Sequence, residues 1–373
     1  MARVFTHKTW LENALRICLA APLPPPYGGM AVQAAKTADG LRQYGVHVDV
    51  VQVNRHPSEG KMLEKLWGIR TLVQTSRFLL QLRRSLKHCR ILYIYTAFFN
   101  YFFWVTCPAL LLAYGYHLPV ILSARGGGAR NFFAKYGKWI RPLMRRLRCA
   151  TAPSEFLAEP LREHFSVPTK VIRTLIDLEQ FPFKKRQPLR PYLVTSRHLE
   201  PIYGVDTVLR AFAKVHGVVP QARLSIVGDG SLRSQLENLA ESLGVEKSVT
   251  FYGAVSHENM ADIYAQHDIC INGSRVDNLP NGLLEAFASG LLVVSTGAGG
   301  IPYLVDHGRT GLLVDVDDAH GLAQCVLQLL NDPPKAASMA LAARREVEKY
   351  APQAVLPELV ALLQAHAGLP PKL

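Results

Sequence analysis

Several features that define particular classes of protein are missing from this sequence of 373 residues. Its cysteines never form a Cys-x-x-Cys pair, so the sequence indicates neither a zinc site nor a disulfide framework. Isolated thiols of this kind suit a reducing compartment. The pattern of aspartates and histidines does not suggest a catalytic metal, and we expect none. The six cysteines are Cys18, Cys89, Cys107, Cys149, Cys270 and Cys325.

A secretory signal is also not expected near the first residue. The only apolar run there, residues 17–21, falls well below the apolar core of a signal peptide. We therefore expect a cytoplasmic protein. The Asn272-Gly-Ser274 sequon is then expected to be unused, because glycosylation needs the secretory route.

The chain is longer than one hydrophobic core usually supports, so we expect two domains of about 150–200 residues each. Its 49% hydrophobic and 19% charged residues are typical of folded cores and exclude a disordered chain. The excess of 42 Lys and Arg over 29 Asp and Glu gives a net charge of +13. This charge favours polyanions, which include nucleic acid, an anionic membrane surface and phosphorylated small molecules, without choosing among them.

One segment, residues 91–124, contains no charged residue and is long enough to cross a membrane. Asn100, Pro108 and Gly115 interrupt it. These breaks favour a second interpretation, in which two buried strands flank one apolar helix.

Strand-like and helix-like segments alternate in two series, which predicts an α/β fold with two Rossmann-like, doubly wound parallel-sheet domains facing across a cleft. A Pro-rich, basic stretch separates the two series and is interpreted as the linker between them. The expected organisation is an N-terminal domain (residues 1–184), a linker (185–191), a second Rossmann-like domain (192–350) and a C-terminal helix (351–373) that packs back on the N-terminal domain.

Two turns in the second series are candidates for binding an anion. In Val227-Gly-Asp-Gly-Ser231 a strand runs into a helix, so backbone N–H groups can approach a phosphate, although Gly228 and Gly230 also suit an ordinary tight turn. In the second, residues 277–290, Asn281 is a candidate N-cap of a helix. The N–H groups of Gly282, Leu283 and Leu284 would then be open to a phosphate.

Two acids flank this second turn. Glu285 is placed to accept hydrogen bonds from a vicinal diol such as ribose, and Asp277 would lie beyond the phosphate. The alternative is that both acids only stabilise the positive end of a helix.

From Arg197 onward the chain resembles the donor-binding half of glycosyltransferase family 4. The resemblance rests on TSRHLEPIYGVDTVLRAFA, LSIVGDGSLRSQLE, VTFYGAVSHENMADIYAQHDICINGS and DNLPNGLLEAFASGLLVVSTGAGGIPYLVDHGRTGLLV, which together cover most of residues 192–320. The N-terminal half matches more loosely, through PPPYGGM, APSEFLAEPL and IDLEQF. The family has the GT-B fold, uses sugar nucleotides and retains the configuration of the transferred sugar.

The resemblance implies roles for individual residues. The family's pair of acids falls on Asp277, which would hold the donor sugar, and Glu285, which would hold the ribose. Arg197 matches the arginine on the pyrophosphate, and Gly28 and Gly29 match a glycine loop near the reacting centre. The residues expected to bind the donor are Gly28, Gly29, Arg125, Tyr203, Gly228, Gly230, Asn281, Gly282, Leu283 and Leu284, with Arg197, Asp277 and Glu285 as catalytic residues.

The sequence departs from the family pattern at four places. Tyr203 stands where a lysine is usual, Asp277 replaces a glutamate, and Tyr303 occupies the place of another glutamate. A histidine is missing after residues 119–124, where Arg125 and Arg130 are candidates to restore the charge lost at position 203.

Residues 135–148 form a candidate basic helix that contains six cations beside Trp139 and other apolar residues. Such a helix can lie on an anionic membrane, or it can pack on the sheet with a solvated basic face.

The resemblance implies a retaining glycosyltransferase that moves a hexosyl group from a nucleoside diphosphate sugar, UDP rather than GDP, to a saccharide or lipid-linked acceptor in cell-surface glycan synthesis. We expect no cofactor besides this donor substrate, and a location in the cytoplasm or at the inner face of the membrane. Tyr203 and Asp277 leave open a relative that binds sugar nucleotides with little or no transfer. Nucleic-acid binding lacks any motif beyond the positive charge.

Overall fold

The computed structural model describes residues 15–25, 28–54 and 67–368. Part of the PPPYGGM segment, Pro26 and Tyr27, lies outside these residues. Contacts divide the chain into two compact units, Met1–Leu175 with Pro352–Leu373, and Ile176–Ala351.

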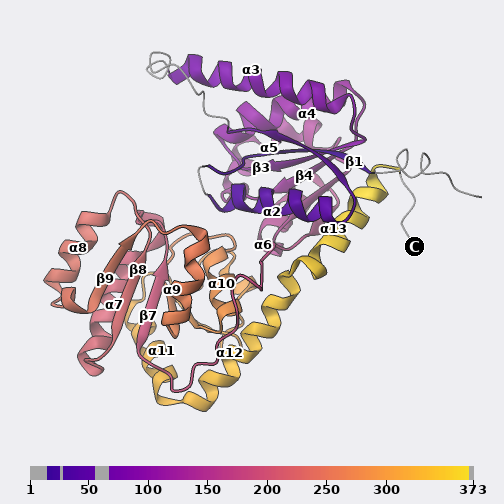
Figure 1. The fold of residues 1–373 in the computed structure, drawn as a ribbon. Coiled ribbons are helices and arrows are strands. Elements are labelled where there is room, and N and C mark those ends of the chain that lie inside the picture. Colours follow the sequence, from indigo (N-terminus) through magenta and orange to yellow (C-terminus); the bar gives the residue numbers. More distant parts are fainter. Residues whose placement is uncertain (1–14, 26–27, 55–66, 369–373) are drawn as a thin grey trace, which may run out of the picture. The chain divides into compact units, whose positions relative to one another are not determined.

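The first unit is built on a parallel six-stranded sheet in the order β2-β1-β3-β4-β5-β6. The central strands are buried along their whole length because helices cover both faces of the sheet (Figure 1). One core lies under α3, α4 and α5, and the other under α2 and α13. The strands are β1 (Arg16–Ala21), β2 (His47–Gln52), β3 (Ile91–Thr96), β4 (Val120–Ala124), β5 (Cys149–Ala152) and β6 (Thr169–Val171). The helices are α2 (Gly29–Gln43), α3 (Trp67–Leu86), α4 (Cys107–Gly115), α5 (Ala129–Met144), α6 (Glu155–Phe165) and α13 (Pro352–His366).

The uncharged segment forms β3, a π-helical turn (Phe102–Thr106), α4 and β4. This confirms the interpretation as a buried strand-helix-strand unit. Among the residues that the structure describes, no helix combines the length and apolar character needed to cross a bilayer.

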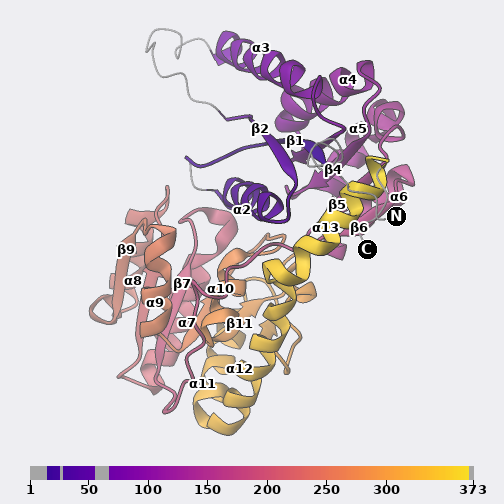
Figure 2. The same ribbon diagram turned by 45° about the vertical axis from the view of Figure 1, so that its right-hand side comes forward.

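The second unit contains another parallel six-stranded sheet, in the order β12-β11-β10-β7-β8-β9 (Figure 2). Helices again pack on both faces, with α7 and α11 over one core and α9 and α10 over the other. The strands are β7 (Tyr192–Ser196), β8 (Arg223–Val227), β9 (Val249–Gly253), β10 (Ile269–Asn272), β11 (Leu292–Thr296) and β12 (Leu312–Val314). The helices are α7 (Val205–Val218), α8 (Arg233–Ser242), α9 (Met260–Gln266), α10 (Asn281–Ser289), α11 (Ala319–Asn331) and α12 (Pro333–Val347).

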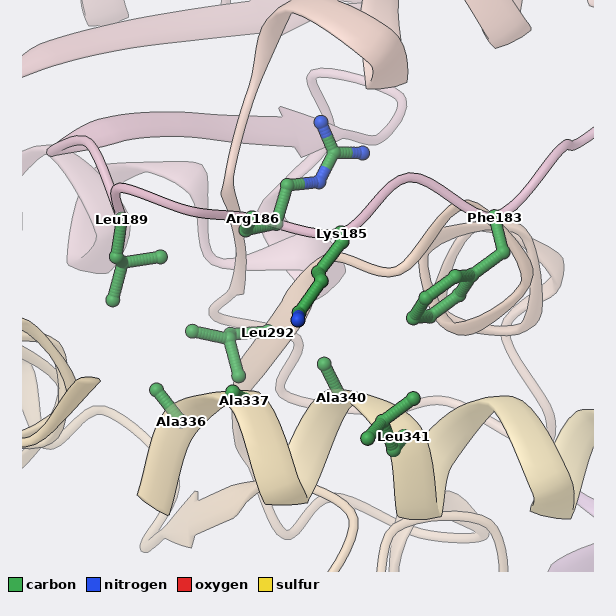
Figure 3. Close-up of a pocket in the computed structure, with 9 residues that line it drawn as sticks. All are labelled: Phe183, Lys185, Arg186, Leu189, Leu292, Ala336, Ala337, Ala340 and Leu341. Carbon is green, nitrogen blue, oxygen red and sulfur yellow. The ribbon is translucent and has the colours of Figure 1, made fainter. Parts of the chain in front are cut away.

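The stretch expected to be a linker, residues 185–191, lies inside the second compact unit. Figure 3 shows Lys185 and Leu189 pointing toward α12, while the guanidinium of Arg186 points away from it. That guanidinium donates hydrogen bonds to the carbonyls of Tyr264, 3.2 Å away, and Ser289, 2.8 Å away. The segment is therefore part of a packed layer rather than a solvated connection.

The C-terminal helix α13 belongs to the first unit, where it packs on α2. Leu356 is fully buried there, and Gly40 of α2 leaves the space for its side chain, since a Cβ at Gly40 would lie 2.6 Å from Leu356 Cδ1. Residues 369–373 of the expected C-terminal segment lie outside the described residues.

Candidate donor-binding site

The guanidinium of Arg197 lies at the centre of a polar cluster in the second unit. Arg197 directly follows β7, and its Nε donates to Oδ1 of Asn272 at the end of β10, 2.9 Å away. Its Nη2 lies 2.8 Å from Oδ2 of Asp277, and its guanidinium carbon lies 5.6 Å from the centre of the Tyr203 ring. Because parallel strands end at the same edge of a sheet, residues far apart in sequence meet here, where ligands of such sheets usually bind.

Nη2 of Arg197 is buried and forms no hydrogen bond within the part of the chain that the structure describes. Its contact with Asp277 is therefore a charge pair whose geometry does not satisfy a hydrogen bond. A buried donor without an acceptor is costly, so this group is suited to an incoming oxygen atom.

Asp277 is held mainly by its own protein surroundings. Its Oδ1 accepts the N–H of Asn278 at 2.8 Å, and its Oδ2 accepts the hydroxyl of Ser274 at 3.3 Å. Behind this loop, Gly300 donates its N–H to the carbonyl of Asp277 at 2.9 Å. A Cβ at Gly300 would lie 1.7 Å from the carbonyl oxygen of Asn278, so the loop requires a glycine at this position.

The helix in the predicted turn, α10, begins at Asn281, but the expected capping is wrong. Pro280 is the N-cap, and no side chain caps the helix. The N–H of Leu283 donates to the carbonyl of Pro280 at 3.1 Å, so it is not open to a phosphate as expected. The side chains of Leu283 and Leu284 are buried in the core. Proline takes the N-cap position because its fixed φ fits the extended chain that leads into the helix.

Glu285 lies one turn into α10 with a side chain that is 10% exposed. Its two oxygens lie 3.1 Å from Nε2 of His257 and 3.1 Å from the hydroxyl of Tyr264. Burial, and then the neighbouring carboxylate of Glu285, raise the pKa of Tyr264 well above its ordinary value, so this hydroxyl keeps its proton and donates it.

Three glycines predicted to allow a ligand close to the backbone have protein atoms in that space. A Cβ at Gly282 would lie 2.7 Å from Oγ of Ser196, and one at Gly230 would lie 2.6 Å from the carbonyl oxygen of Leu199. Gly228 has a φ of +137°, and its Cβ would lie 1.9 Å from the carbonyl oxygen of Arg197. These contacts account for the glycines by chain packing alone.

The remaining predicted residues belong to the first unit. Gly28 is the N-cap of α2 and Gly29 its first residue, and no atom of the described residues lies within 4 Å of the place of a Cβ at Gly28. Arg125 follows β4, donates to Ser123 at 3.0 Å and stacks 4.6 Å from the ring centre of Tyr95. No carboxylate among the described residues forms an ion pair with it. Arg130 instead pairs with Glu159 and Glu163.

Several residues of the cluster were not predicted. Asn272 and Ser274 were noticed only as a sequon, yet both are buried and contact Arg197 or Asp277. Their position directly after a buried strand was the available signal. No local sequence pattern predicted a role for the residues around Glu285, which are His257, Tyr264 and Gln180. Among the described residues, no group of His, Cys, Asp and Glu is arranged to hold a metal ion.

Family comparisons agree with this architecture. Residues 27–180 match the model described as Glycosyltransferase Family 4, and residues 178–346 match the model described as Glycosyl transferases group 1. Both units are thus accounted for, in the order that the family pattern requires. The chain belongs to glycosyltransferase family 4.

Two curated relatives resemble part of the chain. It is 36% identical over 164 residues to a GDP-mannose-dependent alpha-(1-6)-phosphatidylinositol monomannoside mannosyltransferase of Mycolicibacterium smegmatis, over 42% of each chain. It is 34% identical over 155 residues to an N-acetyl-alpha-D-glucosaminyl L-malate synthase of Bacillus anthracis, over 42% of this chain and 40% of that protein. The matched region thus spans about two fifths of the length of these relatives.

Solved structures resemble the whole chain. One of them is an Anabaena protein, HepE, in complex with UDP and glucose, with a TM-score of 0.69 at 18% identity. The match covers 94% of this chain and 100% of the HepE chain. A sucrose-phosphate synthase from Thermosynechococcus elongatus has a TM-score of 0.75 at 18% identity, over 94% and 99%. At this identity the likeness shows the fold, which is GT-B.

The contact between Gly228 and Arg197 predicts a large effect of Gly228→Ala. The added Cβ meets a carbonyl oxygen and the backbone angle is unfavourable, so we expect a loss of about 2–4 kcal/mol of unfolding free energy. Gly217→Ala in helix α7 is the matched control, because a Cβ there would have no atom of the described part of the chain within 4 Å, and it should stabilise by about 0.5–1 kcal/mol. Chemical denaturation measures the unfolding free energy of both variants. Equal values would contradict the conclusion that chain packing requires a glycine at position 228.

Proposed function

We propose that this chain is a retaining glycosyltransferase that moves a hexosyl group from a nucleoside diphosphate sugar to a saccharide or lipid-linked acceptor in cell-surface glycan synthesis. The observation that carries the proposal is the buried Nη2 of Arg197 at the carboxyl edge of the second sheet, for which the residues that the structure describes provide no hydrogen-bond acceptor. A diphosphate oxygen would supply that acceptor. As the bond to the sugar breaks, charge grows on the departing diphosphate, and a fixed guanidinium stabilises that charge.

The departures from the family pattern support a second candidate, a protein that binds sugar nucleotides with little or no transfer. Tyr203 places an uncharged ring near Arg197, and Asp277 contributes a negative charge 2.8 Å from the guanidinium. Both features reduce the positive potential that a leaving diphosphate would meet. Binding without turnover would favour this candidate.

A nucleotide panel tests the proposal. Thermal shifts measured with UDP, GDP and their hexose conjugates should show stabilisation by at least one conjugate, because a ligand that binds only the folded state raises its melting temperature. Mass spectrometry of products with candidate acceptors then tests transfer. We expect UDP sugars to give the larger shift, while similarity to proteins named for GDP-mannose makes GDP-mannose the necessary comparison. Absence of any shift throughout the panel would reject both candidates.

Tyr203 lacks the positive charge of the lysine that is usual at its position. Arg125 and Arg130 are the two candidates to supply that charge, and they can be compared directly. We propose that Arg125, which has no carboxylate partner among the described residues, contributes positive charge to the reaction, whereas Arg130 is neutralised by Glu159 and Glu163. We expect Arg125→Gln to lower kcat by about 10- to 1000-fold and Arg130→Gln to change it less than about threefold. Equal kcat values for the two variants would remove Arg125 from the mechanism.

We also propose peripheral contact of helix α5 with an anionic membrane. Trp139 of this helix is 86% exposed, with Lys138 exposed beside it and Arg145 exposed just beyond the helix end. By contrast Ile140 and Met144 are buried in the core, so the exposed apolar surface of the helix is centred on Trp139. An aromatic side chain among cations is typical of helices that lie at a lipid interface.

Vesicle flotation tests this contact. The protein should float with vesicles that contain phosphatidylglycerol but not with pure phosphatidylcholine, and Trp139→Ala should reduce the bound fraction at least threefold, because the indole contributes apolar burial in the interface. Salt should weaken binding further, since exposed charges are screened. If Trp139→Ala floats as well as the unchanged protein does, α5 is not the contact.

A further inference from the structure

A chain of hydrogen bonds surrounds the carboxylate of Glu285 and extends across the second unit. We call these residues, Gln180, His257, Tyr264 and Ser196, the Glu285 network. Gln180 contacts His257, which contacts one oxygen of Glu285. On the other side Ser196 contacts Tyr264, which contacts the second oxygen.

Gln180 fixes the proton on the ring of His257. Its side-chain nitrogen lies 3.0 Å from the carbonyl oxygen of His257, an atom that only accepts, so this end of the amide must be the NH₂ group. The same nitrogen lies 3.0 Å from Nδ1 of His257. Nδ1 must therefore be the acceptor, and the ring proton resides on Nε2, from where it is donated to Glu285.

Tyr264 supplies the second donor. Its hydroxyl has one proton and lies near three other oxygens, Oγ of Ser196 at 2.8 Å, Oε2 of Glu285 at 3.1 Å and the carbonyl oxygen of Gly282 at 3.5 Å. The charged oxygen is the stronger acceptor, so the tyrosine proton goes to Glu285 and Ser196 donates to the tyrosine oxygen. Ser196 directly precedes Arg197, which links this network to the cluster around the guanidinium.

We propose that Gln180, His257 and Tyr264 are positioning residues, which hold the carboxylate of Glu285 so that both of its oxygens accept hydroxyls of a ribose. This inference rests on the proposed function. Each carboxylate oxygen can accept two hydrogen bonds, and the network occupies one on each oxygen. One acceptor position remains on each, which matches the two hydroxyls of a vicinal diol. Without the neutral donors on both sides, the side chain could rotate and the paired geometry would be lost.

The test compares each nucleoside diphosphate with its 2′,3′-dideoxy counterpart, using UDP and GDP, by titration calorimetry. The unchanged protein should bind the ribose form about 10- to 100-fold more tightly, because hydrogen bonds to a charged group are involved. In His257→Ala, Gln180→Ala and Tyr264→Phe this preference should fall to below about fivefold, with affinity for the dideoxy form unchanged within about twofold. His257→Gln, whose amide nitrogen can replace Nε2, should retain most of the preference.

Matched controls are His320→Ala and Tyr252→Phe, both exposed and outside the network. If Glu285→Ala loses the ribose preference while the three network variants keep it, the inference is overturned and the proposed function stands. Equal weakening of the ribose and dideoxy forms would indicate general damage to the fold and would also overturn it. If the unchanged protein binds neither UDP nor GDP, the proposed function fails, and the inference fails with it.

Discussion

One buried cation fixes the part of the second unit on which the candidate site depends. The guanidinium of Arg186 donates to carbonyls at the C-terminal ends of α9 and α10, where the helix dipoles favour a positive charge. Since α9 carries Tyr264 and α10 carries Glu285, this side chain links the two helices whose side chains meet at Glu285. Asp268, with a side chain that is 1% exposed, lies 3.8 Å away and balances part of the charge.

The guanidinium of Arg197, in contrast to that of Arg186, has protein partners that meet only part of its hydrogen-bonding capacity. Asn272 accepts from Nε, while Asp277 neutralises the guanidinium without completing a hydrogen bond to Nη2. The ring of Tyr203 also packs near Arg197. Asp277 and Tyr203, two residues that depart from the family pattern, thus both lie beside this guanidinium. The result is a cation held in place by aromatic and polar neighbours, with the buried NH₂ group at Nη2 left for a ligand.

Much of the fold followed from local patterns, and the failures have identifiable causes. The α/β alternation, the buried strand-helix-strand unit at residues 91–124 and the start of α10 were predicted correctly, because each depends on periodicity or on a local break. The stretch interpreted as a linker is rich in proline and positive charge, and its Arg186 is buried against two helix ends, a contact that the composition does not indicate. The capping of α10 was misjudged because asparagine and proline adjoin at the helix start, and sequence alone did not decide between them.

The sequence by itself determined two series of buried parallel strands, the family pattern from Arg197 onward, and the two acids on either side of the turn that opens α10. Only the tertiary structure decided what those acids contact: Asp277 pairs with Arg197, and Glu285 accepts from His257 and Tyr264. The physical reason is that these partners come from different loops and helices, separated by 21 to 80 residues in the chain. Strand order brings such segments to one edge of the sheet, and no local propensity records which of their side chains will meet there.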